Sequence, residues 1–324
     1  MAQFSALSRA LDRAARGKRD KKSVASVLIE RERVLFELEE ELQSGTYQPS
    51  PYRTFSIFEP KPRIISAAPF RDRIVHHALM TEIEPILERD AIETSFACRP
   101  GKGGLAAIRA VQALARRHPF VLRLDISRFF VSIDHQRLLA RLNVLIADED
   151  IRDLMRKFVD LGAPAGTPGM GLPVGNLTSQ HFANFFLGFM DRHAVVALGF
   201  KGWIRYVDDY VVAFGSSKRW LWARLQDMSL FLGDELGLML NPRVTRVRPV
   251  QEGIPFLGFR IWPHYVRMDG PHFRRLRRRL ERLDRAIDRE AISEDDAVRS
   301  AAGLIGHAIH AHPRALRHAR RRAR

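Results

Sequence analysis

Cysteine and long apolar runs are scarce in this sequence, and each scarcity excludes a class of protein. The single cysteine, Cys98, rules out an internal disulfide framework and a cysteine-ligated zinc finger. No run of about 18 uncharged apolar residues occurs, so we expect no membrane-spanning helix. The first residues lack the apolar core of a secretory signal, and we therefore expect a reduced, cytoplasmic setting. Apolar residues still make up 46% of the 324 residues, enough for a core in about two domains or lobes.

Lysine and acidic residues are also few, and arginine dominates the charge. The chain has 53 basic and 37 acidic residues, a net charge of +16, and only eight of the basic residues are lysines. A GC-rich genome also favours arginine over lysine, so the distribution of charge along the chain is more informative than the number of arginines. Residues 1–22 carry a net charge of +5 and residues 271–324 a net charge of +8. Two basic ends predict surfaces that follow nucleic-acid phosphates. An anionic membrane is the weaker alternative, because no strong Trp/Phe face accompanies them.

Helix-like and strand-like segments mix along the chain and predict an α+β fold. The strand-like runs 203–207 and 210–214 are separated by two residues and predict a β-hairpin, and 254–267 predicts another. Adjacent antiparallel hairpins disfavour a doubly wound parallel sheet. The other expected elements are helices over 1–44, 71–87, 104–117, 135–142, 176–190, 217–236 and the basic C-terminal end, with strands at 54–58, 120–126 and 243–250.

Three aspartates stand where carboxylates are unusual. Asp208 and Asp209 occupy the predicted two-residue turn, where Asn-Gly or Asp-Gly is preferred because both positions need positive φ. Asp125 ends the apolar run VLRLDI, where a carboxylate needs a partner or a metal ion. Asp134 precedes a helix and is expected to be its N-cap. A solvated turn with two harmless acids is the plain alternative for the 208–209 pair.

Carboxylates at strand ends are oxygen donors of the kind that Mg²⁺ prefers. Two such ions about 4 Å apart stabilise the attacking and leaving oxygens of phosphoryl transfer. Asp125 and Asp208 are 83 positions apart in the sequence, so only the fold can bring them together.

Several segments, in order over roughly residues 45–310, resemble the motifs of reverse transcriptases. RYVDDYVV resembles the catalytic box and LRLDISRFFVSIDH the first palm motif. The others are EPKPRIISAAPFRDRIVHHAL and SFACRPGKGG in the fingers, GLPVGNLTSQHFAN in the palm and FLGFRIWP as a primer-grip-like hairpin. The resemblance implies a right-hand polymerase. Its expected parts are an N-terminal helical extension (1–48), fingers (49–115), a palm (116–262, with a finger–palm connection at 146–170) and a basic helical thumb (263–324).

One stretch resembles diversity-generating retroelement reverse transcriptases in particular. Group II intron enzymes have a Pro-Gln-Gly core here, whereas this chain has Pro173-Val174-Gly175 followed by Ser179-Gln180. The resemblance implies copying of a template-repeat RNA into cDNA with errors at template adenines, for diversification of a target gene. It also implies a primer, dNTPs and a small helical accessory protein as partners.

The resemblance assigns catalysis to Asp125, Asp208 and Asp209. These three carboxylates, with the backbone carbonyl of Ile126, would hold two Mg²⁺ ions.

The incoming dNTP would meet residues of the fingers and palm. The resemblance implies that Lys61 and Arg63 clamp the triphosphate. Arg71 would join them, or would instead form a structural ion pair with Asp72 or Glu84.

Two further positions would set nucleotide selection. Phe130 would exclude the ribose 2′-hydroxyl, while Phe129 is expected to be the core aromatic of the pair. The Val174 side chain has no hydrogen-bond donor or acceptor, whereas a glutamine at this position can hydrogen-bond near the nascent base pair. Val174 would therefore weaken discrimination against mispaired nucleotides. The alternative for Val174 is simple packing on a buried turn.

The nucleic acid would lie along the palm, the primer-grip-like hairpin and the thumb. The residues expected to contact it are Tyr206, Gly258, Arg274, Arg275 and Arg278.

Two other functional readings remain. A defence-associated or retron-type reverse transcriptase would share the motifs but copy with ordinary fidelity. An RNA-binding scaffold on a decayed polymerase fold would lack the carboxylates that this chain retains.

Overall fold

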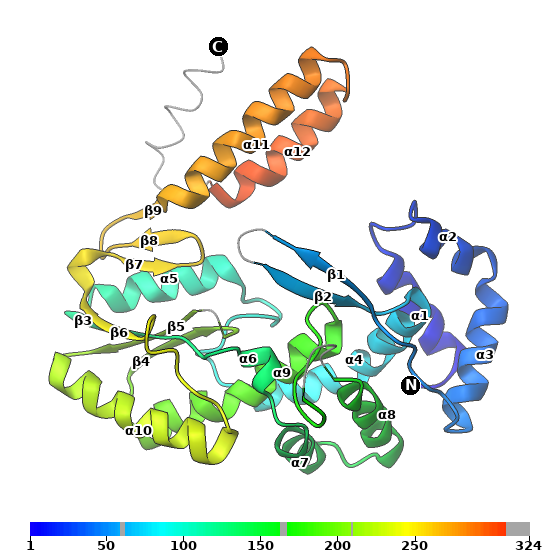
Figure 1. The fold of residues 1–324 in the computed structure, drawn as a ribbon, viewed down its shortest axis with the longest axis horizontal. Helices are drawn as coiled ribbons and strands as arrows, with labels where there is room; N and C mark the ends of the chain where they lie inside the picture. The colour runs from blue at the N-terminus through cyan, green and yellow to red at the C-terminus, as the bar shows by residue number, and fades with distance from the viewer. Residues whose placement is uncertain (59–61, 163–166, 209, 309–324) are drawn as a thin grey trace.

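The computed structural model describes residues 1–58, 62–162, 167–208 and 210–308. Within these ranges it has the mixed helix and antiparallel-sheet architecture that the sequence predicts (Figure 1). Lys61 and Asp209, to which the sequence assigns roles, lie outside the described residues.

Residues 1–44 are helical, as the sequence predicts, and form three helices. They are α1 (Phe4–Ala15), α2 (Lys22–Ile29) and α3 (Arg31–Gln43). The chain turns after α1 at Gly17, whose φ of +68° costs glycine little. α1 packs on the long helix α4 (Phe70–Asp90), and Leu7 and Leu11 of α1 are fully buried. This extension therefore shares the core of the rest of the molecule.

A four-stranded antiparallel sheet occupies the centre of the fold, in the order β4-β5-β3-β6. Its strands are β3 (Phe120–Leu124), β4 (Gly202–Tyr206), β5 (Tyr210–Gly215) and β6 (Arg246–Pro249). Alternate residues point to opposite faces, so Val121 and Val212 join one apolar cluster while Leu122 and Val211 join the other. Helix α5 (Gly104–Ala115) packs on one face, and α10 (Lys218–Leu236) packs on the other (Figure 1).

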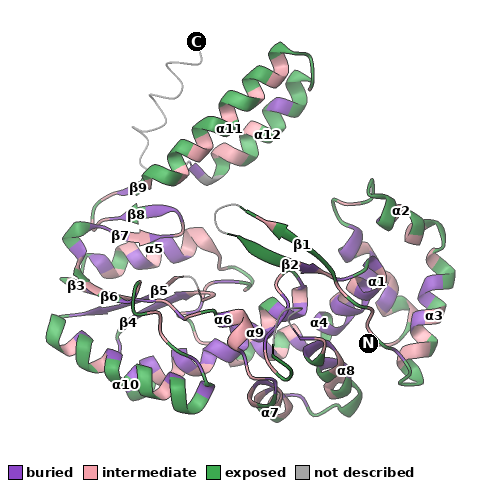
Figure 2. Ribbon diagram, in the orientation of Figure 1, coloured by how far each residue is buried: buried purple, intermediate pink, exposed green. Residues whose placement is uncertain are grey.

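Two smaller regions flank this sheet. The hairpin of β1 (Arg53–Ile57) and β2 (Arg63–Ala67) is largely exposed (Figure 2). The helices between β3 and β4 are α6 (Phe129–Ser132), α7 (His135–Leu145), α8 (Glu149–Asp160) and α9 (Leu177–Arg192), which continues as a π-turn over His193–Ala197. Asp134 caps α7, because its carboxylate accepts a 2.9 Å hydrogen bond from the backbone N–H of Arg137. That prediction is confirmed.

The C-terminal third contains a further sheet and two helices. The expected 254–267 hairpin is a three-stranded sheet, after a 3₁₀ turn over Val250–Glu252. The strands are β7 (Ile254–Phe256), β8 (Phe259–Ile261) and β9 (Val266–Met268), and the helices are α11 (Gly270–Asp288) and α12 (Glu294–Ala308). Because β9 pairs with β8, the expected palm–thumb boundary at residue 263 cuts through one sheet.

Helices α11 and α12 pack on each other and are mostly exposed (Figure 2). Among the described residues, none of the helices combines the length and apolar character needed to cross a bilayer.

Candidate active site

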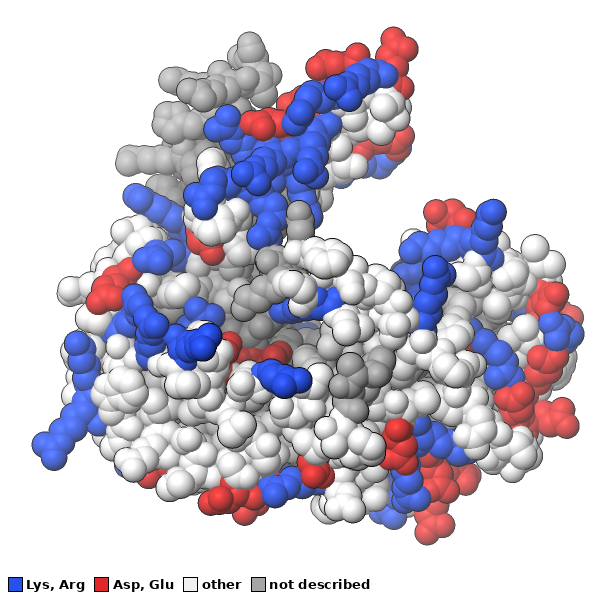
Figure 3. Space-filling model, in the orientation of Figure 1, with Lys and Arg blue, Asp and Glu red and all other residues white. Residues whose placement is uncertain are grey.

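Asp125 and the turn that carries Asp208 lie side by side because of strand pairing. β3 and β5 are antiparallel neighbours, with Leu124 opposite Val211. Asp125 follows β3 directly, and Val207 and Asp208 lie in a turn between β4 and β5. Pairing therefore brings together two segments that are far apart in the chain. Figure 3 shows acidic side chains at the bottom of the hollow between the central sheet and α11.

The position of Asp125 is set by the segment after α10, a relationship that the motifs did not reveal. The Asn241 side-chain amide donates a 2.8 Å hydrogen bond to Oδ2 of Asp125, and the Asn241 backbone N–H donates to the Asp125 carbonyl at 2.7 Å. The Asp125 N–H contacts the Thr245 hydroxyl at 3.4 Å. The Asn241 side chain therefore binds Oδ2 of the carboxylate.

The same segment orients Ile126. A single antiparallel bridge joins Ile126 and Leu240, made by the Asp125 carbonyl and the Ser127 N–H, which donates to Met239. In this type of bridge the central pair does not exchange hydrogen bonds. The carbonyl of buried Ile126 is therefore left out of the bridge, as an additional oxygen ligand would require.

The catalytic-box turn is longer than the sequence predicts. Tyr206 pairs with Tyr210, so three residues separate the strands and the expected two-residue turn is wrong. Val207, expected at the end of a strand, has a φ of +50°. A β-branched residue rarely adopts this left-handed conformation, and such strain persists only where the surroundings impose it.

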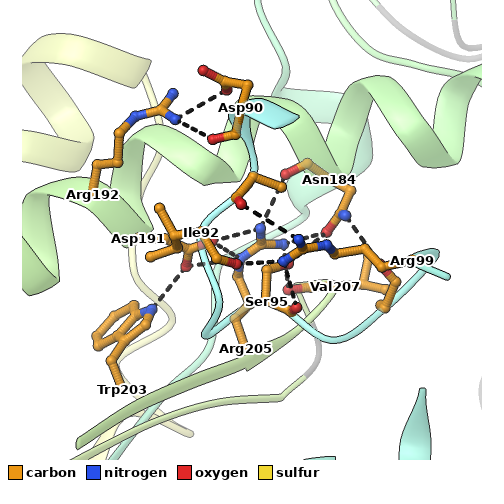
Figure 4. A network of polar contacts seen from close by, with 12 residues as sticks. Asp90, Ile92, Ser95, Arg99, Asn184, Asp191, Arg192, Trp203, Arg205 and Val207 are labelled. Atoms are coloured by element: carbon orange, nitrogen blue, oxygen red, sulfur yellow. Dashed lines mark hydrogen bonds and ion pairs between the residues drawn. The ribbon is translucent and has the colours of Figure 1, made fainter. Parts of the chain in front are cut away.

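Arg205 supplies part of that constraint (Figure 4). Its guanidinium is 1% exposed and forms a bidentate ion pair with Asp191 of α9, which is 0% exposed. It also donates to the side chain and backbone of Asn184, at 2.6 and 3.0 Å, and contacts the Val207 carbonyl at 3.5 Å. The Trp203 indole N–H donates to Asp191 at 2.7 Å. One buried network thus joins α9, β4 and the turn that bears Asp208.

The backbone of Arg205 extends this connection to the loop before α5. Its N–H donates to the Thr94 carbonyl at 2.9 Å, and its carbonyl accepts from the Phe96 N–H at 3.0 Å. Nearby, Arg99 pairs with Glu88 and donates to the carbonyls of Ile92 and Ser95. An arginine inside the apolar run WIRYV was the available signal for this network, but only the fold shows its partners.

The two described carboxylates of the expected ligand set, those of Asp125 and Asp208, fit a magnesium site. Asp125 and Asp208 are half-buried carboxylates at adjacent chain segments, and hard oxygen ligands suit Mg²⁺. Within the part of the chain that the structure describes, no group of three acidic, histidine or cysteine side chains forms a metal cluster. The third expected ligand, Asp209, falls outside that part.

The two adjacent phenylalanines of α6 differ in burial. Phe129 is 2% exposed and belongs to the core, as expected, whereas Phe130 is half-buried. Their rings meet edge to face with centroids 5.5 Å apart. The Phe130 carbonyl accepts a 2.7 Å hydrogen bond from the Leu172 N–H, which places Phe130 beside the loop that carries Val174.

Val174 lies where that loop meets the β1–β2 hairpin. Its carbonyl accepts a 2.8 Å hydrogen bond from the Ser66 N–H of β2, and its side chain is half-buried. A Cβ on Gly175, whose φ is +119°, would stand 2.8 Å from the Ile65 side chain. Asn176 accepts from the Ala68 N–H at 3.2 Å. The loop therefore needs glycine at position 175. Its hydrogen bonds to Ser66 and Ala68 hold β2 close to Val174.

The expected triphosphate ligands are only partly described. Arg63 is exposed at the start of β2, and Lys61 lies outside the described residues. Arg71 forms an ion pair at 2.8 Å with Glu41 of α3. The partners suggested by the sequence, Asp72 and Glu84, are therefore wrong. Asp72 instead accepts a hydrogen bond from the Tyr47 hydroxyl at 2.7 Å.

The residues expected to contact nucleic acid lie on three elements. Tyr206 is half-buried, and this burial raises the pKa of its hydroxyl. Gly258 has a φ of +79° in the β7–β8 turn, and a Cβ there would stand 2.9 Å from the ring of His272 in α11. The remaining three lie on the solvated surface of α11, in which no residue is buried; they are Arg274, Arg275 and Arg278.

Comparison with known proteins identifies the family. Residues 57–261, more than half of the chain, match the family described as reverse transcriptase (RNA-dependent DNA polymerase). Protein YkfC of Escherichia coli K12 is 27% identical over 268 residues, which cover 69% of this chain and 70% of that protein. Group II intron-encoded protein LtrA of Lactococcus lactis is 27% identical over 158 residues, covering 47% of this chain but only 26% of LtrA.

A solved structure supports the fold. The apo telomerase of Candida tropicalis superimposes with a TM-score of 0.53 at 11% sequence identity, covering 68% of this chain and 49% of the telomerase chain. Together with the paired motif strands, the family match leads to one conclusion. The chain belongs to the reverse transcriptase family of RNA-dependent DNA polymerases.

Proposed function

We propose that this reverse transcriptase belongs to a diversity-generating retroelement and copies a template-repeat RNA into cDNA with errors concentrated at template adenines. The observation that carries the proposal is the place of Val174, held by Ser66 at the junction of the β1–β2 hairpin and the palm loop. A glutamine there has an amide that hydrogen-bonds to neighbouring groups, and a valine has none. Losing a polar check weakens discrimination between correct and incorrect base pairs.

The chemistry proposed is nucleotidyl transfer at Asp125, Asp208 and Asp209. These carboxylates would hold two magnesium ions, whose positive charge would lower the pKa of the primer 3′-hydroxyl and offset the negative charge of the departing pyrophosphate. The carboxylates hold those ions, and Asn241 keeps Asp125 oriented.

Other side chains bind and select the dNTP. Lys61 and Arg63 bind the triphosphate, and the half-buried ring of Phe130 excludes a ribose 2′-hydroxyl. Arg71 is assigned to the ion pair with Glu41 rather than to the nucleotide.

The template RNA and growing cDNA lie along the palm and the thumb. Tyr206 and Gly258 contact the primer end, and the exposed arginines of α11 bind backbone phosphates. The small helical accessory protein of the retroelement is the proposed protein partner.

Sequencing the cDNA made from a defined RNA tests the proposal. Val174→Gln is expected to lower misincorporation opposite adenine while errors opposite the other bases change little. Val174→Leu, which keeps an apolar side chain, serves as the matched control and should keep the wild-type spectrum. Reactions with and without the co-encoded helical protein test the partner. An ordinary error rate in the wild type, unchanged by Val174→Gln, would instead favour a defence-associated or retron-type enzyme.

Asp125→Ala separates a polymerase from an RNA-binding scaffold. The variant should make no cDNA yet bind template RNA as the wild type does. Full synthesis by this variant would refute the catalytic assignment.

A further inference from the structure

The sheet of β7–β9 has one buried face and one basic face. Phe256, Phe259 and Ile261 are each no more than 1% exposed, and they pack in the cluster that includes α5. On the opposite face, Arg260 of β8 and Arg267 of β9 stand directly across from each other, and both are exposed. Like charges in this cross-strand position destabilise a sheet. A bound anion would relieve the repulsion.

The neighbourhood offers little negative charge to neutralise this pair. From residue 246 to residue 268 the sequence has four arginines and one acidic residue, Glu252. Glu252 pairs with Arg248 at 3.4 Å, and its backbone carbonyl accepts from Arg260 at 3.3 Å. Figure 3 shows basic side chains over β9 and along α11, which follows it.

Two aromatic rings stand beside the arginines at the β8–β9 turn. Trp262 and Tyr265 are stacked, with ring centroids 4.7 Å apart and planes at 23°. The Arg267 guanidinium lies over the Tyr265 ring, 5.1 Å from its centroid. Both rings are half-buried and therefore keep surface open to solvent.

This turn is fixed by its surroundings. The Trp262 indole N–H donates to the Gln251 carbonyl at 3.1 Å, and Arg116, the residue that follows α5, donates to the Pro263 carbonyl at 2.7 Å. A Cβ on Gly253 would stand 2.5 Å from the Trp262 ring, so only glycine lets the indole lie against the backbone. The aromatic platform is held in place before any ligand binds, which reduces the entropy cost of binding.

We propose that this sheet surface, made of Arg260, Trp262, Tyr265 and Arg267, binds a single-stranded segment of RNA outside the catalytic hollow. The two arginines bind successive phosphates, and an unpaired base stacks on the exposed side of the aromatic pair. Stacking requires an unpaired base, which favours a single strand over a duplex. The proposal rests on reverse transcriptase family membership and not on the adenine-directed errors.

Its location separates the sheet surface from the active site. The Gly258 end of the sheet adjoins α11, because Gly258 accepts a 3.0 Å hydrogen bond from the Asp269 N–H. The Trp262–Tyr265 turn is at the other end, beside the end of α5. RNA bound here would continue the basic surface of α11 away from the catalytic carboxylates.

Binding of single-stranded oligouridine RNA to the full chain, measured across salt concentrations, tests the phosphate contacts. The double variant R260Q/R267Q should lower the slope of log affinity against log salt by about 1.4, at about 0.7 per phosphate contact. The control R156Q/R219Q removes the same charge from exposed positions on α8 and α10 and should keep the slope. R260Q/R267Q should also melt at a slightly higher temperature, because the cross-strand repulsion is gone.

Stacking is tested by Tyr265→Ala, with Tyr265→Phe as the ring-preserving control. Tyr265→Ala should weaken oligouridine binding about tenfold, and Tyr265→Phe should not. Ultraviolet crosslinking should join the RNA to the 262–265 peptide of the wild type. Extension of a short template–primer that fills only the hollow should be unchanged in Tyr265→Ala and Tyr265→Phe, because Tyr265 lies outside the primer-grip-like stretch FLGFRIWP.

The proposal would be overturned by an unchanged salt slope in R260Q/R267Q, by no crosslink at the 262–265 peptide, or by an equal loss of short template–primer extension in the Tyr265 variants. A change in oligomeric state with unchanged RNA affinity would also overturn it, since it would identify a protein interface.

Discussion

The Asn241 amide holds one oxygen of the Asp125 carboxylate at 2.8 Å, while the Asn241 backbone holds the Asp125 carbonyl at 2.7 Å. This double contact fixes the carboxylate at the end of β3. A ligand held by such a partner binds metal without first being ordered, and removal of partners of this kind typically costs metal affinity or activity.

Asn241→Ala should therefore weaken the apparent affinity for Mg²⁺ about 10- to 100-fold. Activity should recover partly at high Mg²⁺, because Asp125 remains. Steady-state synthesis across a Mg²⁺ titration, together with Mn²⁺ binding measured by calorimetry, checks this. Thr245→Val removes only a backbone contact of Asp125 and should leave the Mg²⁺ dependence close to wild type. An unaltered Mg²⁺ requirement in Asn241→Ala would contradict the assignment.

Removing one partner of the Arg205–Asp191 pair should strongly destabilise the folded protein. Asp191→Ala leaves a buried guanidinium unpaired, and we expect a loss of about 3–5 kcal/mol in the free energy of unfolding. Asp90→Ala removes the partner of Arg192 at a more exposed ion pair and should cost about 1 kcal/mol or less. Urea unfolding of both variants makes the comparison. Similar losses in the two variants would show that the buried network is not special.

Phe130→Ala should raise incorporation of ribonucleotides relative to deoxyribonucleotides. The half-buried ring is replaced by open space beside the loop that carries Val174, so a 2′-hydroxyl no longer meets a side chain. Single-nucleotide extension with each nucleotide type measures the ratio. Phe130→Leu keeps much of the bulk and should stay closer to wild type. Equal sugar selectivity in wild type and Phe130→Ala would remove Phe130 from the nucleotide site.

His76 should make the folded protein sensitive to acid. Its ring is 2% exposed and stacks on Phe158, and this burial lowers the pKa of His76 from 6.5 to about 3. Between these two values the unfolded chain binds a proton that the folded chain does not. The free energy of unfolding should therefore fall as the pH decreases below about 6.5, by up to about 1.4 kcal/mol per pH unit from this residue.

His76→Phe keeps the stacked ring but has no group that titrates, so its stability should fall less steeply with acid. Thr178→Val removes only the 3.0 Å contact between the Thr178 hydroxyl and His76. It should lower stability at every pH and keep the wild-type slope. Urea unfolding at pH 6.5 and pH 5 provides the data. Identical slopes in His76→Phe and wild type would show that another group controls the acid response.

The amino-acid pattern alone was enough to predict the α+β class, the cap at Asp134 and the unusual aspartates at strand ends. These features depend on local rules, such as apolar periodicity, helix capping and the cost of a carboxylate in an apolar run. The family followed from motif order, which is also written in the sequence and was confirmed by the match over residues 57–261.

Long-range pairing was decided only by the tertiary structure. Register placed Asp125 next to the turn that carries Asp208, gave that turn three residues and connected Asn241 to Asp125, at a separation of 116 positions. The packing of the elements also paired Arg71 with Glu41 and buried Arg205 against Asp191. Sequence periodicity shows which face of a strand or helix is buried, but not which distant segment covers it. That choice depends on the packing of the whole chain.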